Sequence, residues 1–512
     1  MGAEAPSRRW WALAAVSLSV LAVGLDGTVL TVALPTLAGK LHASESDLQW
    51  FTSAYLLVLA AAMLPAGMLG DRYGRKKVLV VSLVLFALGS ALCATATSSA
   101  EFLAARALLG FAGAGVIVMA VTALTVLFDE RERPRAVGIW AAMNFLALPI
   151  GPILGGWLLT HYWWGWIFLM NVPVVLIALI AVTTLVPESR ASQRPAFDLP
   201  GVGLSVAGLT LLTYGFIRAG QDGWGTLLAL LSIGVGVALL LAFLAWEQRL
   251  TRRADGEPLV DLALFRSASF TWGVILAAIG VLAMLGVMFT MPQYFQGVAG
   301  TSAMGSGLRL LPLIGGLIVG ALPADQLVRR IGAKLGASLG FALIGTGLGL
   351  GTATGVHSSG AFLACWMALV GAGMGLALAT ASSAALAELS PERSGVGSAV
   401  LQAVNKTGGP LGAAILGSVL SSIYLARLSV AGLPAGAGAS ARASIFGAVA
   451  LAHKLGDPAL LQSARGAFVH GMDGALIVSC GFAALGLLLA LAWLPARAHT
   501  QITEQVEVAI TS

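Results

Sequence analysis

Two charged residues stand inside long apolar runs, where ionisable side chains are rare. Asp26 lies in the middle of VLAVGLDGTVLTVALP, and Arg106 lies near the start of another such run. A carboxylate at the centre of a bilayer is costly, and an acid that persists there normally faces a cavity and binds a proton, an ion or a cation. We therefore interpret Asp26 as the chief candidate for proton coupling. The alternative is an Asp that is held by helix contacts alone.

Asp26 and Arg106 are predicted to lie at compatible depths. At the rise of an α-helix, Asp26 is roughly 14 Å and Arg106 roughly 8 Å from the same end of their helices. We hypothesise that they share a polar network in which Arg106 modulates the proton affinity of Asp26. The alternative for Arg106 is a purely structural contact with backbone.

Further candidates are small or polar residues within apolar runs. The segment ALPIGPILGG contains Gly151, Pro152, Gly155 and Gly156, which clear one helix face for close packing and favour a kink. We add the hypothesis that this helix moves or seals, and that Asn144 lines a cavity. In the second half of the chain the polar residues near or within apolar runs either line a substrate path or join helices: Gln293, Gln296, Gln402, Asn405 and Lys406.

Other chemistries lack their sequence patterns. No GxxxxGK[ST] phosphate loop is present, which argues against ATP as an energy source. The six His residues show no metal-ligand spacing, and the three Cys residues all fall in apolar runs. We expect no metal and no cofactor, with a proton gradient as the energy source, and no catalytic residues, because the chain shows no catalytic cluster.

The elements that position these residues are membrane helices. The chain is 58% hydrophobic and only 10% charged, with a mean hydropathy of +0.90. Apolar runs of about twenty residues predict an all-α polytopic protein that crosses the lipid bilayer. The net charge of +6 does not suggest nucleic acid. We predict about fourteen spans, near 11–36, 48–69, 78–97, 102–127, 136–160, 165–186, 200–219, 226–247, 269–293, 305–325, 335–356, 360–386, 396–425 and 472–494. The first is interpreted as a retained span, because its apolar run is too long for a cleaved signal.

The basic residues predict the sidedness. Twenty of the 29 Lys and Arg residues fall in one set of connections, which the positive-inside rule places in the cytoplasm together with both termini. The most basic short connection is GMLGDRYGRKK, residues 67–77. We therefore predict a multi-pass protein of the cell (cytoplasmic or inner) membrane.

A weak internal repeat predicts two halves. RRIGAK, residues 329–334, resembles DRYGRK, residues 71–76, at an offset of 258 residues. The offset fits two parallel six-helix bundles with two extra helices between them. The predicted domains are residues 1–198, an inserted pair with its linker at 199–268, residues 269–496 with a long outer loop at 426–470, and a cytoplasmic tail at 497–512. For the loop, which is rich in Ala and Gly, we favour disorder or loose packing over short surface helices.

Taken in order, these segments resemble the fourteen-helix drug:proton antiporters of the major facilitator superfamily over nearly the whole chain. LDGTVLTVALP resembles their first-helix signature, GMLGDRYGRKK the loop between helices two and three, RALLGFAGA the fourth-helix motif and GPILGG the antiporter motif. WWGWIFLMNVP and VGSAVLQAVNKTGGPLGAAILGS also match. Among the departures, Asn405 and Lys406 stand where relatives often have Arg-Gln.

The resemblance implies roles for the matched residues. Asp26 and Arg106 would serve proton coupling, and the glycine face of helix five would favour exchange over symport. A cytoplasmic gate that holds the halves together when the cavity faces outward would contain Gly67, Gly70, Asp71, Arg72, Gly74, Arg75 and Lys76.

The resemblance also implies the function. The leading hypothesis is proton-coupled efflux of small amphipathic or lipophilic drugs by alternating access, in a monomeric transporter that is not an enzyme. A dedicated exporter of one natural product or metabolite is the alternative, and an uptake symporter is disfavoured by GPILGG. Leu401-Gln402 replaces acids that some exporters of dications carry, so we expect monocationic or neutral lipophilic substrates.

Overall fold

The computed structural model describes residues 6–128, 132–190, 198–252, 262–387, 391–430 and 437–495. Some helical side chains lie outside this description, among them those of Asp71, Asn144, Gln402 and Lys406. Every regular element in the described residues is a helix. In chain order these are α1 (Pro6–Lys40), α2 (Glu45–Tyr73), α3 (Arg75–Thr95), α4 (Ser99–Leu127), α5 (Arg133–His161), α6 (Trp166–Leu169), α7 (Asn171–Leu185), α8 (Leu199–Asp222), α9 (Leu227–Thr251), the 3₁₀ helix η1 (Leu262–Arg266), α10 (Ala268–Gln293), the π-helix η2 (Tyr294–Val298), α11 (Ala303–Arg309), α12 (Leu311–Ala321), α13 (Ala324–Gly351), α14 (Gly360–Ala387), α15 (Pro391–Arg427), α16 (Ala437–Ala443), α17 (Ile445–Leu455) and α18 (Pro458–Trp493).

Eleven helices in the described part of the chain are long and apolar enough to cross a membrane. Helices are the expected solution, because a chain in lipid must satisfy its backbone hydrogen bonds internally. The chain is thus a multi-pass membrane protein with an all-helical fold. The total of fourteen spans stays a prediction.

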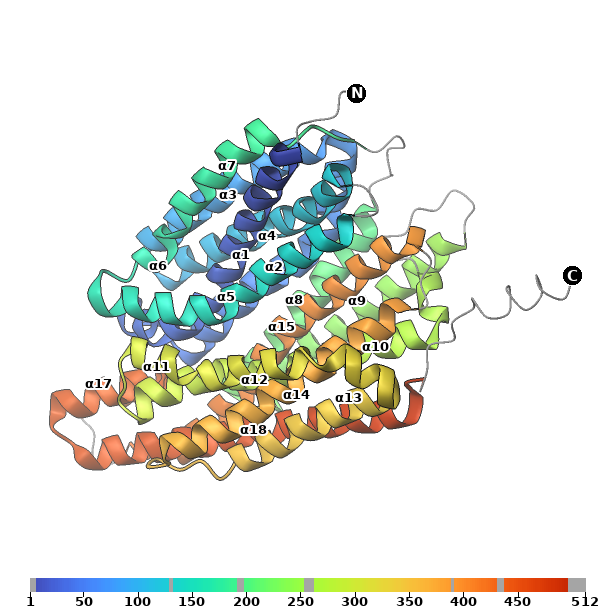
Figure 1. Ribbon diagram of the computed structural model, residues 1–512. Helices are drawn as coiled ribbons and strands as arrows, with labels where there is room; N and C mark the ends of the chain where they lie inside the picture. The colour runs from blue at the N-terminus through green and yellow to red at the C-terminus, as the bar shows by residue number, and fades with distance from the viewer. Residues whose placement is uncertain are drawn as a thin grey trace, which may run out of the picture.

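The helices gather around two apolar cores. One core contains buried residues between Ala12 and Val186 together with Phe289, and the other contains buried residues between Leu264 and Leu494 together with Val32. In Figure 1 the first group, α1 to α7, lies above the second, α10 to α18. The inserted pair α8 and α9 pack on each other, and α8 also contacts α2 and α15. The boundaries at 198 and 268 stay predictions.

The two halves share an unusual backbone position. Gly74, between α2 and α3, has φ 114°, and Gly332, within α13, has φ 85°. These glycines are 258 residues apart, the offset that the DRYGRK and RRIGAK segments predict. A positive φ is readily adopted by Gly but costs other residues energy. The repeat is therefore present in the backbone as well as in the sequence.

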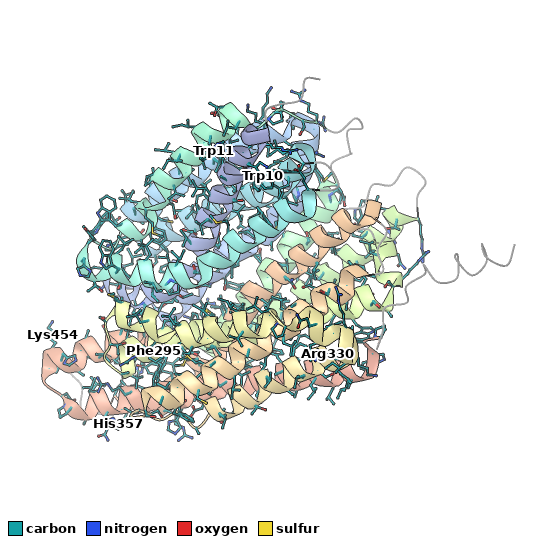
Figure 2. All side chains as sticks on the ribbon, in the orientation of Figure 1. Trp10, Trp11, Phe295, Arg330, His357 and Lys454 are labelled. Carbon is teal, nitrogen blue, oxygen red and sulfur yellow. The ribbon has the colours of Figure 1, made fainter. Side chains whose placement is uncertain are left out.

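The bundle has two distinguishable ends. We call the end that holds α17 the α17 end and the end where α1 begins the terminal end. Figure 1 shows the two groups of helices closest together near α11 and diverging toward the terminal end. Figure 2 places His357 and Lys454 at the α17 end and Arg330 at the opposite end. By the distribution of basic residues, the α17 end is the one predicted to face outward.

The prediction of a loose loop at 426–470 is wrong for its described part. That region contains α16, α17 and the first turns of α18, which begins at Pro458 rather than near residue 472. Ile445, Ala448 and Ala452 of α17 are buried, and the Tyr424 hydroxyl donates to the Ala441 carbonyl oxygen at 2.8 Å. Alanine gives little hydropathy contrast but is the best helix former, so composition alone misrepresented this segment.

We expect alanine at Gly74 or Gly332 to lower the free energy of unfolding by about 1–2 kcal/mol, because each position requires a positive φ. Alanine at Gly349, which lies in the same helix as Gly332 and has open space beside it, should be neutral or slightly stabilising. Thermal unfolding in detergent measures both effects. Equal melting temperatures for the three variants would contradict this account.

Candidate functional site

A buried ion pair joins the two charged residues singled out in the sequence. Asp26 of α1 and Arg106 of α4 meet with 2.6 Å between Oδ2 and Nη1. Both side chains are almost fully buried, with 0% and 1% of their surfaces exposed. The contact inferred from their depths is therefore present. Its role in proton coupling stays a prediction.

Backbone and aromatic groups of α2 hold the rest of the Arg106 guanidinium. Its Nε donates to the Phe51 carbonyl oxygen at 3.2 Å, and its central carbon lies 4.2 Å from the centroid of the Tyr55 ring. Tyr55 in turn donates from its hydroxyl to the Val23 carbonyl oxygen of α1 at 3.2 Å. Gly110 permits this approach, since a Cβ there would lie 3.1 Å from the Leu59 nitrogen. Arg106 of α4 is thus held by contacts with two other helices, α1 and α2.

Asn171, which was not singled out as a site residue, completes the environment of the carboxylate. Its Nδ2 donates to Asp26 Oδ1 at 3.3 Å and lies 3.5 Å from the Ser90 hydroxyl oxygen. Asn171 Oδ1 is buried without a partner. A lone Asn within WIFLMNVPVVL was the available signal, because amides in membrane spans usually make contacts between helices.

The arrangement makes proton binding and arginine contacts interdependent. A proton on Asp26 removes the negative charge that balances Arg106, which keeps the Phe51 carbonyl and the Tyr55 ring but has no counter-charge within reach among the described residues. A buried charge without its partner is strongly destabilised, so the four surrounding helices would have to readjust. In the described part of the chain, no group of three or more His, Cys, Asp or Glu side chains is placed to share a metal ion.

The glycines of α5 form the opposite wall of α1. Cβ atoms at Gly151 and Gly155 would lie 3.3 Å from the Val29 nitrogen and 2.9 Å from Val29 Cγ1. Thr28 strengthens the contact by donating from Oγ1 to the Ala147 carbonyl oxygen at 2.9 Å. The helix that carries Asp26 is therefore packed between α4, which carries its ion-pair partner Arg106, and the glycine surface of α5.

The same glycine segment also reaches the other half. A Cβ at Gly156 would lie 2.6 Å from Met304 Cα, and Gly307 of α11 packs on the Pro152 carbonyl. Asn144, predicted to line a cavity from this helix, lies outside the described side chains. The close-packing role inferred for GPILGG thus extends across the two halves at the α17 end.

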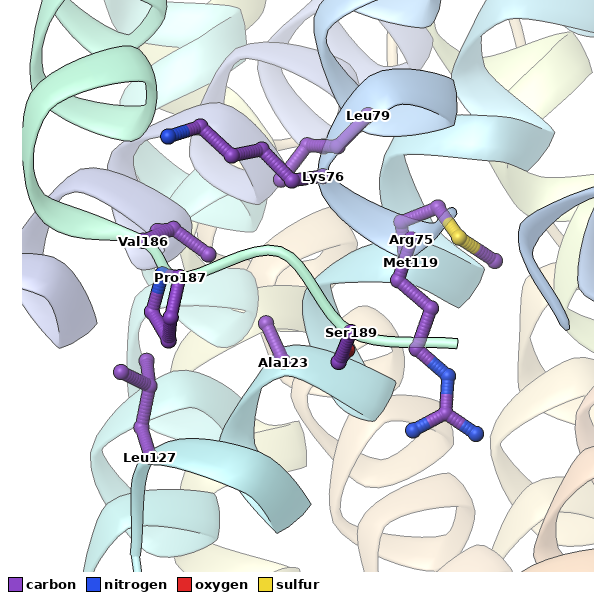
Figure 3. A pocket seen from close by; sticks show the side chains of 9 residues that line it. All are labelled: Arg75, Lys76, Leu79, Met119, Ala123, Leu127, Val186, Pro187 and Ser189. Atoms are coloured by element: carbon purple, nitrogen blue, oxygen red, sulfur yellow. The ribbon is translucent and has the colours of Figure 1, made fainter. Parts of the chain in front are cut away.

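The basic connection at 67–77 packs on the segment that follows α7 (Figure 3). The Arg75 nitrogen donates to the Ser189 carbonyl oxygen at 2.9 Å, and the Lys76 nitrogen donates to Glu188 Oε1 at 3.1 Å. Lys76 Nζ donates to the Thr183 carbonyl oxygen at 2.7 Å. Gly70 lies against Met119, while Gly67 lies near Val118 and Arg72 is exposed. These contacts stay within the first half. Asp71, the acidic residue of the predicted gate, has its side chain outside the description.

The polar candidates of the second half separate into two groups. Gln293 Nε2 donates to Glu45 Oε1 at 3.3 Å, and Gln296 Nε2 donates to the Val32 carbonyl oxygen at 3.1 Å. Both therefore join the halves at the α17 end. Asn405 is half-buried, with its Oδ1 lacking a partner. The side chains of Gln402 and Lys406 lie outside the description.

Comparison with known proteins identifies the family. A family model described as the Major Facilitator Superfamily matches residues 16–413. The chain belongs to this superfamily. This facilitator is 33% identical to the tetracenomycin C resistance and export protein of Streptomyces glaucescens, over 81% of this chain and 76% of that protein. It is 31% identical to the multidrug efflux pump LfrA of Mycolicibacterium smegmatis, over 93% and 94% of the two chains.

A solved structure has the same fold. The crystal structure of a bacterial homologue of the human lysosomal transporter Spinster, in an inward-facing and unoccupied conformation, superposes with a TM-score of 0.70. It covers 97% of this facilitator and all of that chain at 18% identity. Family and fold together make this facilitator a membrane transporter for small molecules rather than an enzyme.

We expect Asp26→Asn to destabilise the protein by about 3–5 kcal/mol, because Arg106 is left charged, buried and unpaired. The double variant Asp26→Asn/Arg106→Gln should lose less than the two single variants summed. The exposed pair Arg218–Asp222, 3.2 Å apart, is the matched control, and Asp222→Asn should cost less than about 1 kcal/mol. Unfolding in detergent gives each value. Equal losses for Asp26→Asn and Asp222→Asn would exclude this view of the pair.

Proposed function

We propose that this facilitator exports small amphipathic or lipophilic compounds across the cytoplasmic membrane in exchange for protons. The buried Asp26–Arg106 pair carries the proposal. A carboxylate so enclosed has few uses other than reversible proton or cation binding, and its partner changes environment when it is neutralised. The names of the relatives, a multidrug efflux pump and a resistance and export protein, support export as the direction.

The proposed cycle alternates access between the two ends. Contacts between the halves at the α17 end suit a state that opens toward the terminal end, which we place in the cytoplasm with both chain termini. In the opposite state the α17 end would open, and Asp26 would take a proton from outside while substrate leaves. The proton gradient is the proposed energy source, without another cofactor, and the proposed transporting unit is a monomer.

The proposed cytoplasmic gate at residues 67–77 would act in the state that is closed at the terminal end and open at the α17 end. When the terminal end closes, Asp71 with Arg72, Arg75 and Lys76 would hold the halves together. The glycine face of α5 would seal the α17 end while the protein is open to the cytoplasm, which favours exchange over leakage.

The proposed substrates are neutral or monocationic lipophilic compounds. Asp26 is the clear carboxylate in the middle of a span, and one acid neutralises one positive charge. A dedicated exporter of a single natural product is the second candidate, and the likeness to the tetracenomycin C export protein favours it. A panel of lipophilic compounds separates these two candidates by the breadth of transport.

Inverted membrane vesicles test proton exchange. Added substrate should dissipate a preformed pH gradient, and Asp26→Asn and Arg106→Ala should each abolish that response because they break the proposed coupling pair. Asp222→Asn removes an exposed carboxylate and should respond as the wild type does. The proposal fails if both pair variants couple normally, or if transport is driven by ATP and resists protonophores.

A further inference from the structure

A second buried carboxylate lies where the two halves meet. Glu45 stands in the first turn of α2, ahead of the apolar run at 48–69, and only 6% of its surface is exposed. Its Oε1 accepts a hydrogen bond from Gln293 Nε2 of α10, a residue 248 positions away. One turn further on, Gln49 packs against Gly417 of α15. The residues that enclose Glu45 therefore include groups from the opposite half.

Glu45 has no cation to balance a negative charge. No Lys, Arg or His side chain in the described part of the chain lies within salt-bridge distance of it. α10 has no charged residue, and the exposed basic residues at this end include Lys40, His42, Arg427, His453 and Lys454. Two others are half-buried. Arg218 of α8, a helix that also packs on α2, pairs with Asp222, and Arg465 of α18 lines a cavity with Tyr294 and Arg309. A buried carboxylate without a cation is far more costly than its neutral form.

The other ionisable groups nearby do not replace that cation. On α15, Tyr424 is close enough to interact with the charge of Glu45, but its hydroxyl donates to Ala441. On α2 itself, Asp47 accepts from the Ser44 nitrogen and hydroxyl, each at 2.8 Å, and closes the helix cap. Both are neutral or negative, so they add nothing that favours an ionised Glu45.

Unsatisfied amide atoms beside Glu45 favour its protonated form. Gln293 Oε1 and both polar side-chain atoms of Gln49 are buried without a hydrogen-bond partner. An ionised carboxylate only accepts hydrogen bonds, whereas a protonated carboxyl also donates one. Protonation of Glu45 supplies a donor for the two unpaired acceptors, Gln293 Oε1 and Gln49 Oε1, while its carbonyl oxygen can still accept from the unpaired donor Gln49 Nε2.

We propose that Glu45 is a second proton-binding site of this facilitator, which takes up a proton when the halves close at the α17 end and releases it there when they open. The proposal rests on the alternating movement in the proposed function but not on proton exchange at Asp26. Glu45 would therefore set how strongly acidity at the α17 end favours closure.

The direction of the pH effect follows from burial. In the closed arrangement burial raises the pKa of Glu45 to about 7, and the hydrogen bond from Gln293 opposes only part of that rise. Separation of the halves returns the carboxyl to water and to its ordinary pKa of 4.5. Protonation of Glu45 favours closure fully when the pH is below the ordinary pKa of 4.5. This contribution is lost as the pH rises through the pKa of about 7 in the closed arrangement. Between these two pKa values, the ratio of closed to open protein should change about tenfold per pH unit.

The test measures closure directly, in full-length protein in lipid nanodiscs without substrate or gradient. Spin labels at Lys40→Cys on α1 and Lys454→Cys on α17 report the distance across the α17 end, after Cys365 and Cys480 are replaced by alanine. Asp26→Asn together with Arg106→Gln in the background removes titration of the first acid without leaving an unpaired buried arginine. The short-distance population should rise as pH falls from 8 to 5, with the tenfold dependence above.

Two variants and a control decide the outcome. Glu45→Gln mimics the protonated form and should hold the short distance at every pH. Glu101→Gln neutralises an exposed acid in the first turn of α4, at the same end, and should titrate as the parent does. Gln293→Glu places a second carboxyl opposite Glu45 and should steepen the pH dependence, because closure then takes up more than one proton.

The inference is overturned if the parent shows no pH dependence, if Glu45→Gln retains it, or if Gln293→Glu leaves its steepness unchanged. These outcomes are separable from failure of the proposed function, which is read from proton exchange in vesicles. Normal exchange with no titration at Glu45 would leave proton-coupled export standing and remove the second site.

Discussion

The ion pair between Asp26 and Arg106 is the contact around which the first half is organised. Two full charges in a low-dielectric interior remain there only if each meets the other at short range and their remaining hydrogen-bonding groups are satisfied. The distance of 2.6 Å meets the first condition. Phe51, Tyr55 and Asn171 meet the second from α2 and α7. Because these partners come from separate helices, none of the four helices can shift alone without exposing a charge to an apolar environment.

α1 connects this pair to the contact between the halves. One face carries Asp26, and another carries Thr28, Val29 and Val32 against the glycines of α5. The α5 glycine segment continues to Gly156, which touches the backbone of α11. α1 and α5 are in close contact with no free space between them at these glycines. A shift of α1 that follows a change at Asp26 therefore requires α5 to move as well. Close packing thus connects protonation of Asp26, through α1 and α5, to the contact between Gly156 and α11 that joins the two halves.

The sequence identified those parts of the site that depend on one helix at a time. Asp26 and Arg106 stood out because charge inside an apolar run is rare, and counting residues along a helix gave their relative depth. The DRYGRK and RRIGAK repeat was visible for a similar reason, since it depends on local glycine geometry at Gly74 and Gly332. Most of helix α17 falls within residues 442–454, which were considered as short surface helices, but disorder or loose packing was favoured there because the region is rich in Ala and Gly.

The residues that sequence reasoning missed depend on partners far away in the chain. Tyr55 and Asn171 look like ordinary residues of apolar helices until α4 and α1 lie beside them. Glu45 looks like a solvated acid at a helix start, where negative charge suits the helix dipole. The approach of Gln293, 248 residues later, gives it a partner from the opposite half.

The two carboxylates differ in what encloses them. Asp26 is paired with a cation of its own half, so its burial survives any rigid movement of that half as a body. Glu45 is enclosed partly by the opposite half, so in the proposed cycle its burial would be lost when the α17 end opens. The rigid-body part of the proposed cycle would therefore leave Arg106 beside Asp26, whereas it would remove Gln293 from Glu45. The same chemical group is thus suited to carrying a proton in one position and to sensing closure in the other.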